Sequence, residues 1–293
     1  MGFRYEGVSM WLRGNTHIHT TRSDGGKSPE EVASLYASAG YDFICLTDHW
    51  VASREQDHGR GAWPLVVLDG IELDGRDSRG SFYHVVCLGT FDGLSREMGF
   101  EAALASAGSQ GGFLDLAHPA WTGNSVEEAL RYPFHAVEAY NHVCTWLNGK
   151  GSGLYVWDAM LEERYGVFGL AVDDAHMSRN HPGWNGAWVM VAAADRSPGC
   201  IMDALRSGRF YSSCGPRILS IGVSGDSIHC STSPIRFARL VGPRHRGDRV
   251  GSFDGATLTE FRIPLPQDCP YVRLEVEDDR GRRAWTNTLF TGP

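Results

Sequence analysis

The sequence lacks the patterns that identify several common classes of protein. No apolar run approaches the length of a membrane-spanning helix, and no basic region followed by an apolar run opens the chain, so we expect a cytoplasmic protein. The seven cysteines are scattered and form no C-x-x-C pair, which fits a reduced compartment with mostly buried thiols. The formal charge of −8 argues against a broad nucleic-acid-binding surface, because phosphate binding needs clustered lysine and arginine.

Two motifs of well-known enzyme classes are also missing. No glycine-rich phosphate loop opens a helix, since the stretch from Gly108 to Gly112 is at best a turn. No G-x-S-x-G motif of the serine hydrolases occurs either. Nucleotide-driven chemistry and serine-hydrolase chemistry are therefore not favoured.

The 293 residues can form one large domain, or a medium domain followed by a small one. Between residue 10 and about residue 211, short apolar runs alternate with helix-like segments, which is typical of βα units around a parallel sheet. One helix is expected between Ser28-Pro29 and Gly40, and two others within 151–166 and 197–209. Short alternating runs between Gly, Pro and Asp follow, and they predict a small antiparallel β unit from residue 213 onward.

Histidines and carboxylates gather at the ends of the expected strands. His17 and His19 are one residue apart, so in a strand both rings would lie on one face and converge on a single atom. Asp174 and His176 repeat this spacing. Most of the other members also lie at or just past the carboxyl end of a strand, where β/α barrels build their sites: Asp24, His49, Glu72, His84, His118 and Glu138.

So many imidazoles and carboxylates at one rim would repel one another or compete for protons unless cations lay between them. Nitrogen and oxygen ligands without thiolate favour Zn²⁺, Mn²⁺ or Fe. The set also exceeds the four or five ligands that one ion can use. The sequence therefore predicts a cluster of divalent metal ions.

The order of these motifs resembles the PHP (polymerase and histidinol phosphatase) domain. The resemblance covers roughly residues 10–212 and consists of His17-x-His19, Asp24-Gly, Leu-Thr-Asp-His, Gly-x-Glu, an isolated His, His-Pro and Asp174-x-His176. The segment LRSGRFYSSCGP, followed by a small β unit, also looks like the CehA/McbA-like branch of PHP metallohydrolases. The resemblance implies an α/β fold: a distorted (β/α)7 barrel over residues 1–212 with a small antiparallel β-rich domain at 213–293.

The resemblance also implies up to three divalent ions per chain and a hydroxide bridging them as the nucleophile. PHP enzymes with this kind of site hydrolyse phosphoesters. The implied ligands fall into three groups, one per ion: His17, His19, Glu72 and Asp174; Glu72 as a bridge with His84 and His118; Asp24, His49 and His176.

Cationic side chains near these motifs are candidates for binding a phosphate. Arg22 lies between two implied ligands, Arg209 lies where the barrel would end, and Lys27 is on a nearby loop. We predict Arg22 and Arg209 as catalytic residues beside Glu72 and Asp174. The ordinary alternative for each arginine is a solvated surface charge.

Several neighbours of the implied ligands have two interpretations. Asp48 should point away from the face of His49 and support the site from behind. By the same alternation of side chains, Asp173 is not counted as a metal ligand. Glu138 and Asn141 either meet substrate or, for Glu138, pair with a basic neighbour in a barrel strand.

Other aromatic residues and histidines are assigned less directly. Trp50, Trp121 and Trp184 either wall a pocket or belong to an aromatic core. The remaining histidines are expected at the surface: His58, His135, His142, His181, His229 and His245. Exceptions are expected first at His142 and His181, because these two follow site strands.

Three functions are compatible with the sequence. The first is a metal-dependent hydrolase of a small phosphoester, because divalent ions outweigh the carboxylates of Asp24, Glu72 and Asp174 and would attract a small anion. The second keeps the metals and cleaves a carbamate or aryl ester. The third is a non-catalytic metal-containing binding module. The pattern leaves the physiological metal and the oligomeric state open.

Overall fold

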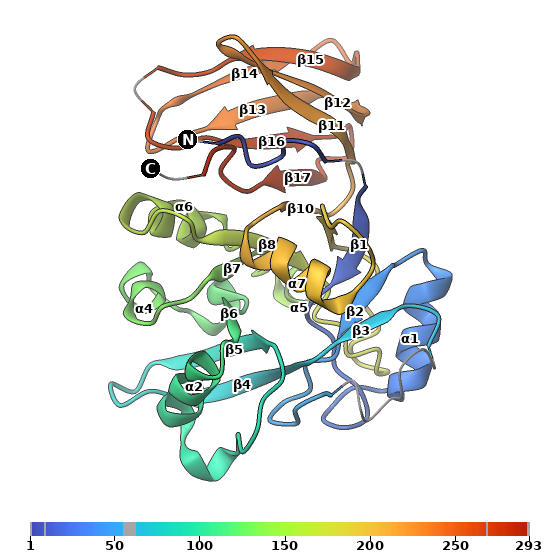
Figure 1. The fold of residues 1–293 in the computed structure, drawn as a ribbon, viewed down its shortest axis with the longest axis vertical. Helices are drawn as coiled ribbons and strands as arrows, with labels where there is room; N and C mark the ends of the chain where they lie inside the picture. The colour runs from blue at the N-terminus through green and yellow to red at the C-terminus, as the bar shows by residue number, and fades with distance from the viewer. Residues whose placement is uncertain (1, 9, 55–62, 268, 292–293) are drawn as a thin grey trace.

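The computed structural model describes residues 2–8, 10–54, 63–267 and 269–291. Within these ranges the strands form three sheets of nine, five and three strands (Figure 1). In sheet order, the nine-stranded sheet consists of β14 (Gly247–Gly251), β13 (Phe237–Val241), β16 (Arg273–Glu277), β17 (Arg283–Thr286), β10 (Phe210–Ser213), β9 (Trp188–Val191), β1 (Leu12–Asn15), β2 (Phe43–Cys45) and β3 (Val66–Leu68).

The other two sheets are shorter. The five-stranded sheet consists of β4 (Gly70–Arg76), β5 (Phe82–Leu88), β6 (Phe113–Leu116), β7 (Ala136–Asn141) and β8 (Phe168–Val172). The three-stranded sheet consists of β11 (Ile218–Ser224), β12 (Ser227–Ile235) and β15 (Leu258–Pro264).

The first two sheets mix parallel and antiparallel pairs, so the parallel sheet expected from the sequence is present only in part. β1, β2 and β3 are parallel, as are β6, β7 and β8, but β4, β5 and β6 pair antiparallel, and so do β1 and β9. The connection between β4 and β5 is too short for a crossover helix. Asp77 closes it by accepting hydrogen bonds from the amides of Arg79 and Ser81.

The apolar run from 64 to 73 divides at Asp69 into two strands that belong to different sheets. Beyond the strand ends, isolated bridges join Ile18 to Ala175 and His49 to Glu72, and these bridges connect the two larger sheets. The described strands nevertheless form separate sheets and do not close into one barrel. The α/β class agrees with the prediction, and the distorted (β/α)7 barrel stays a prediction.

The three helices expected from the sequence are present. The first begins with the expected capping box, in which the Ser28 hydroxyl accepts from the amide of Glu31, and it ends before Gly40, whose φ is 79°. The described helices are α1 (Pro29–Ser38), the 3-10 helix η2 (Arg96–Met98), α2 (Phe100–Ser109), α3 (Pro119–Thr122), α4 (Val126–Arg131), α5 (His142–Asn148), α6 (Leu154–Glu163) and α7 (Pro198–Arg206).

Helices α2, α4 and α6 lie on one side of the five-stranded sheet (Figure 1), and their apolar residues share one core with it. Trp157 of α6 is fully buried there. A Cβ atom at Gly169 of β8 would lie 2.7 Å from the Trp157 ring, so only glycine permits this close approach. The other face of the sheet meets a second core that includes Leu12, Phe43 and Val172.

The C-terminal strands pair antiparallel, as predicted. However, β10 pairs with both β9 and β17, so the nine-stranded sheet continues across residue 213. The first residues of the chain also join this unit, because Phe3 pairs with Phe290, and Figure 1 shows both termini there. The division into residues 1–212 and 213–293 therefore stays a prediction.

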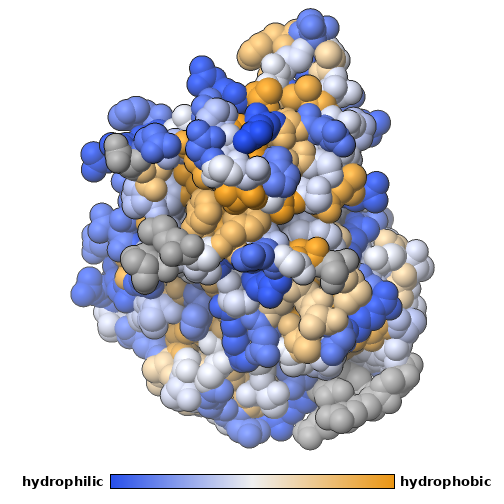
Figure 2. Space-filling view, turned by 45° about the horizontal axis from the view of Figure 1, so that its top comes forward, coloured by the Kyte–Doolittle hydropathy of each residue, from blue (hydrophilic) through white to orange (hydrophobic). Residues whose placement is uncertain are grey.

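The surface in Figure 2 has hydrophilic residues around its edge and apolar residues gathered in its middle part. None of the described helices combines the length and the apolar composition needed to cross a membrane. All seven cysteines are free thiols, and four of them are buried.

Asn287 connects the C-terminal segment to the strands of the α/β part. Its side-chain carbonyl accepts from the amide of Gly169 (3.0 Å), and its amide donates to the carbonyls of Gly208 and Phe210 (both 3.1 Å). Asn287→Ala removes these partners from buried backbone groups, so we expect the free energy of unfolding to fall by about 2–5 kcal/mol in urea titrations. Asn148→Ala, at an exposed position, should change it by less than about 0.5 kcal/mol. Equal losses in both variants would contradict this role.

Candidate metal centre

The predicted metal ligands come from seven segments of the chain and meet in one cluster. His17 and His19 follow β1, His49 follows β2, and Asp174 follows β8. The short distances between neighbouring side chains, all below 4 Å, connect every member of the predicted set: His17, His19, Asp24, His49, Glu72, His84, His118, Asp174 and His176.

The first group of ligand atoms surrounds a point between His17 and His19. The Nε2 atoms of these rings are 3.1 Å apart. Glu72 Oε2 lies 3.4 Å from His17 Nε2 and 3.2 Å from His19 Nε2, and Asp174 Oδ1 lies 3.3 Å and 3.2 Å from the same atoms. Two imidazole nitrogens this close to each other and to two carboxylates need a proton or a cation between them.

Glu72 is the centre of the second group. Its side chain is only 1% exposed, and its Oε1 atom lies 2.8 Å from His84 Nδ1 and 3.6 Å from His118 Nε2. Its Oε2 atom lies 3.2 Å from His49 Nδ1. One buried carboxylate thus lies beside imidazoles from both larger sheets, as the position of a shared ligand requires.

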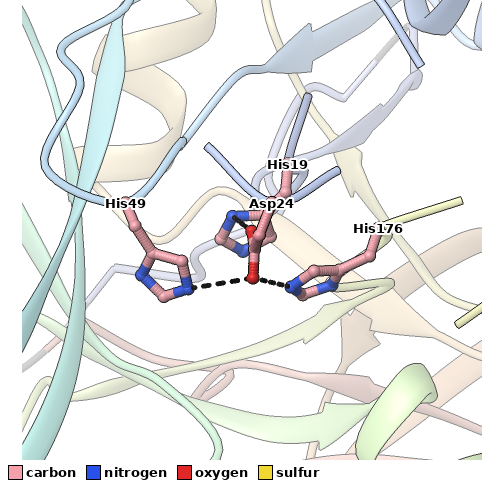
Figure 3. A group of neighbouring side chains, drawn as sticks. All are labelled: His19, Asp24, His49 and His176. Carbon is pink, nitrogen blue, oxygen red and sulfur yellow. Dashed lines mark ion pairs between the residues drawn. The ribbon is translucent and has the colours of Figure 1, made fainter. Parts of the chain in front are cut away.

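The third group lies nearer to the solvent. Asp24 is 55% exposed at its side chain, and Figure 3 shows its carboxylate between the rings of His49 and His176. Asp24 Oδ2 is 3.3 Å from His176 Nε2 and 3.9 Å from His49 Nε2, and Oδ1 is 3.6 Å from His19 Nδ1. His19 therefore lies beside the first group with its Nε2 atom and beside the third group with its Nδ1 atom. The sequence did not predict that His19 would belong to two groups.

Charges in the cluster shift the pKa values of its members in opposite directions. Burial disfavours a charged His17 ring, but the carboxylates of Asp174 and Glu72 overcome this and raise its pKa well above the usual value. Burial likewise opposes the shift at His176, where Asp24 and Asp174 raise the pKa to about 9. The pKa of Glu72 is well below its usual value, because the surrounding imidazoles outweigh burial. Protons occupy the metal-free cluster where cations would be bound.

The residues present fit divalent metal ions. Several buried nitrogen and oxygen atoms of the cluster have no hydrogen-bond partner among the described residues: His19 Nδ1, His49 Nδ1, Glu72 Oε2 and His118 Nδ1. Buried polar atoms are normally paired, so these atoms are available as ligands. Imidazole nitrogens and carboxylate oxygens without thiolate suit Zn²⁺, Mn²⁺ or Fe.

A pocket of about 140 Å³ opens onto the cluster. The ligand residues form one wall, and the other wall consists of Trp121, Val143, Cys144, Leu147 and His181. Among the described residues that line this pocket there is no lysine or arginine. The apolar wall comes from α3 and α5, which directly follow the site strands β6 and β7.

The predicted phosphate-binding cations do not line this pocket. Arg22 lies on the loop before Asp24, where its amide donates to Thr20 Oγ1, and Lys27 is 3.7 Å from Glu31. Arg209 precedes β10 and donates to the carbonyl of Glu6. Because β10 and β1 both pair antiparallel with β9, Arg209 lies at the end of the sheet opposite to His17. The structure therefore does not bring Arg209 to the cluster.

The neighbouring carboxylates support the ligand loops. Asp48 accepts from the amide and hydroxyl of Thr20 (2.7 and 2.8 Å) and from the Ser23 hydroxyl (2.7 Å), which holds the loop before Asp24. Asp173 accepts from the Tyr36 hydroxyl and from the amides of residues 185–187. Both point away from the cluster, as the alternation of side chains along a strand predicts.

Two polar residues near the cluster, Cys144 and Asp115, were not assigned from the sequence, and His181 was named there only as an exception among the surface histidines. His181 lines the pocket, with its ring centroid 5.4 Å from that of His176, and Cys144 Sγ lies 3.9 Å from Asp174 Oδ2. Asp115 is fully buried in β6, and neither of its oxygens has a hydrogen-bond partner among the described residues. Its position inside the apolar run Phe113–Ala117 is the signal that could have identified it.

Of the two interpretations given to the tryptophans, the structure supports a different one at different positions. Of the three tryptophans, only Trp121 lines the pocket. Trp50 donates to the carbonyl of Asp74, and Trp184 packs against Tyr36 in an aromatic core. His58 lies outside the described residues.

No family model and no curated protein matches this chain. A solved two-domain protein from Bacteroides vulgatus, which contains a predicted PHP-like metal-dependent phosphoesterase, is similar in structure with a TM-score of 0.52. The similarity covers 97% of this chain and 96% of that chain at 14% identity. The chain has the fold of this two-domain protein. The resemblance to PHP proteins is thereby confirmed for the fold.

A second solved structure is similar over a smaller part of the chain. It is an amidohydrolase from Chromobacterium violaceum with bound sulfate and no metal, 15% identical, with a TM-score of 0.47. The similarity covers 67% of this chain and 96% of that chain. The CehA/McbA-like branch stays a prediction.

The pKa shifts predict how metal binding depends on pH. Because the pKa values of His17, His49, His118 and His176 are raised, their contribution to the stability of the metal-free protein is complete below about pH 6.5 and declines as the pH rises toward 9, the pKa of His176. Divalent ions compete with those protons, so they bind more tightly as the pH rises. The melting-temperature difference between Zn²⁺-loaded and chelator-treated protein should therefore increase from pH 5.5 to 8.5.

The measurement is differential scanning fluorimetry across this pH range, with metal content determined at each pH. The depressed carboxylate pKa values, including that of Glu72, do not affect the trend, because those groups stay ionised throughout. A difference that is flat or falls with pH would contradict the metal centre.

Proposed function

We propose that this chain is a metal-dependent hydrolase of PHP type that cleaves a small phosphoester at a cluster of up to three divalent ions. The observation that carries the proposal is the meeting of nine nitrogen and oxygen ligand residues, the buried Glu72 among them, in one cluster, more than one ion can use. The fold supports it, since the Bacteroides vulgatus protein contains a predicted PHP-like phosphoesterase. The proposal includes the distorted (β/α)7 barrel and the division at residue 213.

The proposed ligand groups follow the distances in the cluster. Divalent ions held there would supply Lewis-acid activation of water and of the scissile ester. The buried Glu72 would be shared between two groups, and the remaining ligands would be His17, His19 and Asp174 in the first group, His84 and His118 in the second, and Asp24, His49 and His176 in the third.

The residues of the pocket have separate tasks in this proposal. Glu72 and Asp174 would hold the ions in fixed positions, which would orient the ester for attack. His181 lines the pocket without belonging to a ligand group, so it is placed to exchange a proton with the leaving group. Arg22 stays a candidate for contacting an anionic substrate from the loop beside Asp24.

The pocket wall favours a second candidate function, hydrolysis of a carbamate or aryl ester. Trp121, Val143 and Leu147 line the same pocket as the ligand residues. The lack of a lysine or arginine in the described lining means that only the ions would supply positive charge. A non-catalytic module is less favoured, because structural metal sites are normally closed, whereas this cluster borders an open pocket.

A substrate panel distinguishes these candidates. Protein with a defined Zn²⁺ or Mn²⁺ content should hydrolyse p-nitrophenyl phosphate or bis-p-nitrophenyl phosphate faster than a naphthyl carbamate. Glu72→Gln should lower kcat/KM by about a thousandfold, equivalent to about 4 kcal/mol of transition-state stabilisation. Glu128→Gln, in a capping box on α4, is the control and should keep the activity. Cleavage of the carbamate alone would favour the second candidate.

The apolar wall predicts a preference among leaving groups. Trp121 and Trp146 are both exposed tryptophans, but only Trp121 lines the pocket. Trp121→Ala should raise KM for p-nitrophenyl phosphate about tenfold, because an aromatic contact worth about 0.5–1.5 kcal/mol beyond area burial is lost. Methyl phosphate should be affected much less, and Trp146→Ala should affect neither substrate. A similar effect of both tryptophan variants would argue against this wall as the leaving-group site.

A further inference from the structure

Glu138 connects two of the proposed ligand loops from behind the cluster. It lies in β7 and is fully buried. Its Oε1 atom is 2.6 Å from His17 Nδ1, and its Oε2 atom accepts from the amide of His118 (2.7 Å) and from the side-chain amide of Asn141 (2.8 Å). Among the described residues Glu138 pairs with no lysine or arginine, and the basic neighbour that it does pair with is the imidazole of His17.

The contact with His17 decides which ring nitrogen carries the proton. A carboxylate only accepts hydrogen bonds, so His17 Nδ1 must carry the hydrogen that faces Glu138. In the neutral ring that metal binding requires, the Nε2 lone pair is then directed at the point shared with His19, Glu72 and Asp174. Carboxylates that accept from the second nitrogen of a metal-binding histidine fix its tautomer and orientation in the same way.

The contact with His118 acts on the backbone. His118 has a φ of 27°, a conformation that residues other than glycine rarely adopt. Its amide donates to Glu138 Oε2, and its ring reaches Glu72 Oε1 at 3.6 Å. The charge-assisted bond therefore holds the strained turn that brings this ring to the cluster.

Asn141 extends the network to the last site strand. Its side-chain amide donates to Glu138 Oε2 and to Asp174 Oδ2 (3.2 Å), and its carbonyl accepts from the amide of Cys144 at the start of α5. Asp174 also has a positive φ, of 55°. One carboxylate is thus connected to ligands that follow β1, β6 and β8.

We propose that Glu138 is a positioning residue that sets the tautomer of His17 and the backbone of His118 for metal binding. The inference deepens the proposed function and concerns the same centre, but its main test is metal affinity, so it can fail while hydrolysis is found, and the reverse.

The neighbouring Asp115 does not take over this task. Burial and the charge of Glu138 raise the pKa of Asp115 well above its usual value. This disfavours the ionised form of Asp115, and the described hydrogen bond of His17 Nδ1 goes to Glu138 and not to Asp115.

Glu138→Gln tests the proposal with nearly unchanged volume. The amide carbonyl can accept from His118 and Asn141, but the NH₂ group then faces His17 Nδ1 and donates to it. His17 would have to carry its proton on Nε2, the nitrogen that faces the cluster. We expect the affinity for Zn²⁺, measured by competition with a chromophoric chelator, to fall at least tenfold for one equivalent.

The melting temperature of the metal-free protein separates positioning from folding. Glu138→Gln should change it by only a few degrees, Glu138→Asp should recover part of the affinity because it keeps the charge, and Glu128→Gln should match the wild type. Unchanged Zn²⁺ affinity in Glu138→Gln overturns the proposal. So does an equal loss of affinity in Glu138→Gln and Glu138→Asp accompanied by a large fall in the metal-free melting temperature.

The wild type provides a test that does not depend on the folding of any variant. In Zn²⁺-loaded protein with ¹⁵N-labelled histidine, the NMR spectrum should show a proton on Nδ1 of His17 and none on Nε2, with His17→Gln used for assignment. A proton on Nε2 instead of Nδ1 would overturn the assigned tautomer and with it the role of Glu138.

Discussion

The buried carboxylate of Glu72 constrains the whole α/β part of this protein. A carboxylate that is 1% exposed is costly unless charges or hydrogen bonds compensate it, and the surrounding imidazoles provide that compensation. Those imidazoles come from β5 and from the segments after β1, β2 and β6, so both larger sheets must present their strand ends at one point. The short bridges between His49 and Glu72 and between Ile18 and Ala175 hold the two sheets in this arrangement.

Strained backbone among the described residues is concentrated near the cluster. Among the described residues, the non-glycine positions with positive φ are Trp50, His118, Asp174, Met177, Asn185 and Arg244. The first four are proposed ligands or directly follow one. Such conformations each cost on the order of 1–3 kcal/mol and persist where the surroundings over-determine them. Two of the bonds that hold this backbone are the one from the His118 amide to Glu138 and the one from the Asn141 side chain to Asp174. The strained conformations and the positions of these proposed ligands therefore depend on the same hydrogen bonds.

The pocket combines two chemical surfaces that belong to consecutive segments of the chain. Two strands of the five-stranded sheet, β6 and β7, lead directly into the short helices α3 and α5, and these helices supply the apolar lining residues Trp121, Val143 and Leu147. The described cationic side chains lie outside this lining, so the proposed ions and the apolar wall together would define what the pocket accepts. The C-terminal unit continues the nine-stranded sheet on the far side of β10 and contributes no residue to the described pocket lining.

The sequence by itself determined the identity of the cluster. The spacing of His17 and His19, and of Asp174 and His176, depends only on the alternation of side chains along an extended chain, and the capping box at Ser28 depends only on local hydrogen bonds. Tertiary structure decided what depends on strand direction and on contacts between distant segments. The tertiary structure assigned β3 and β4 to different sheets, and it placed Arg209 at the end of the nine-stranded sheet that is remote from the pocket. It also brought Glu138 into contact with His17, which is 121 residues away in the chain. These outcomes follow from pairing between strands, which leaves no local pattern in the sequence.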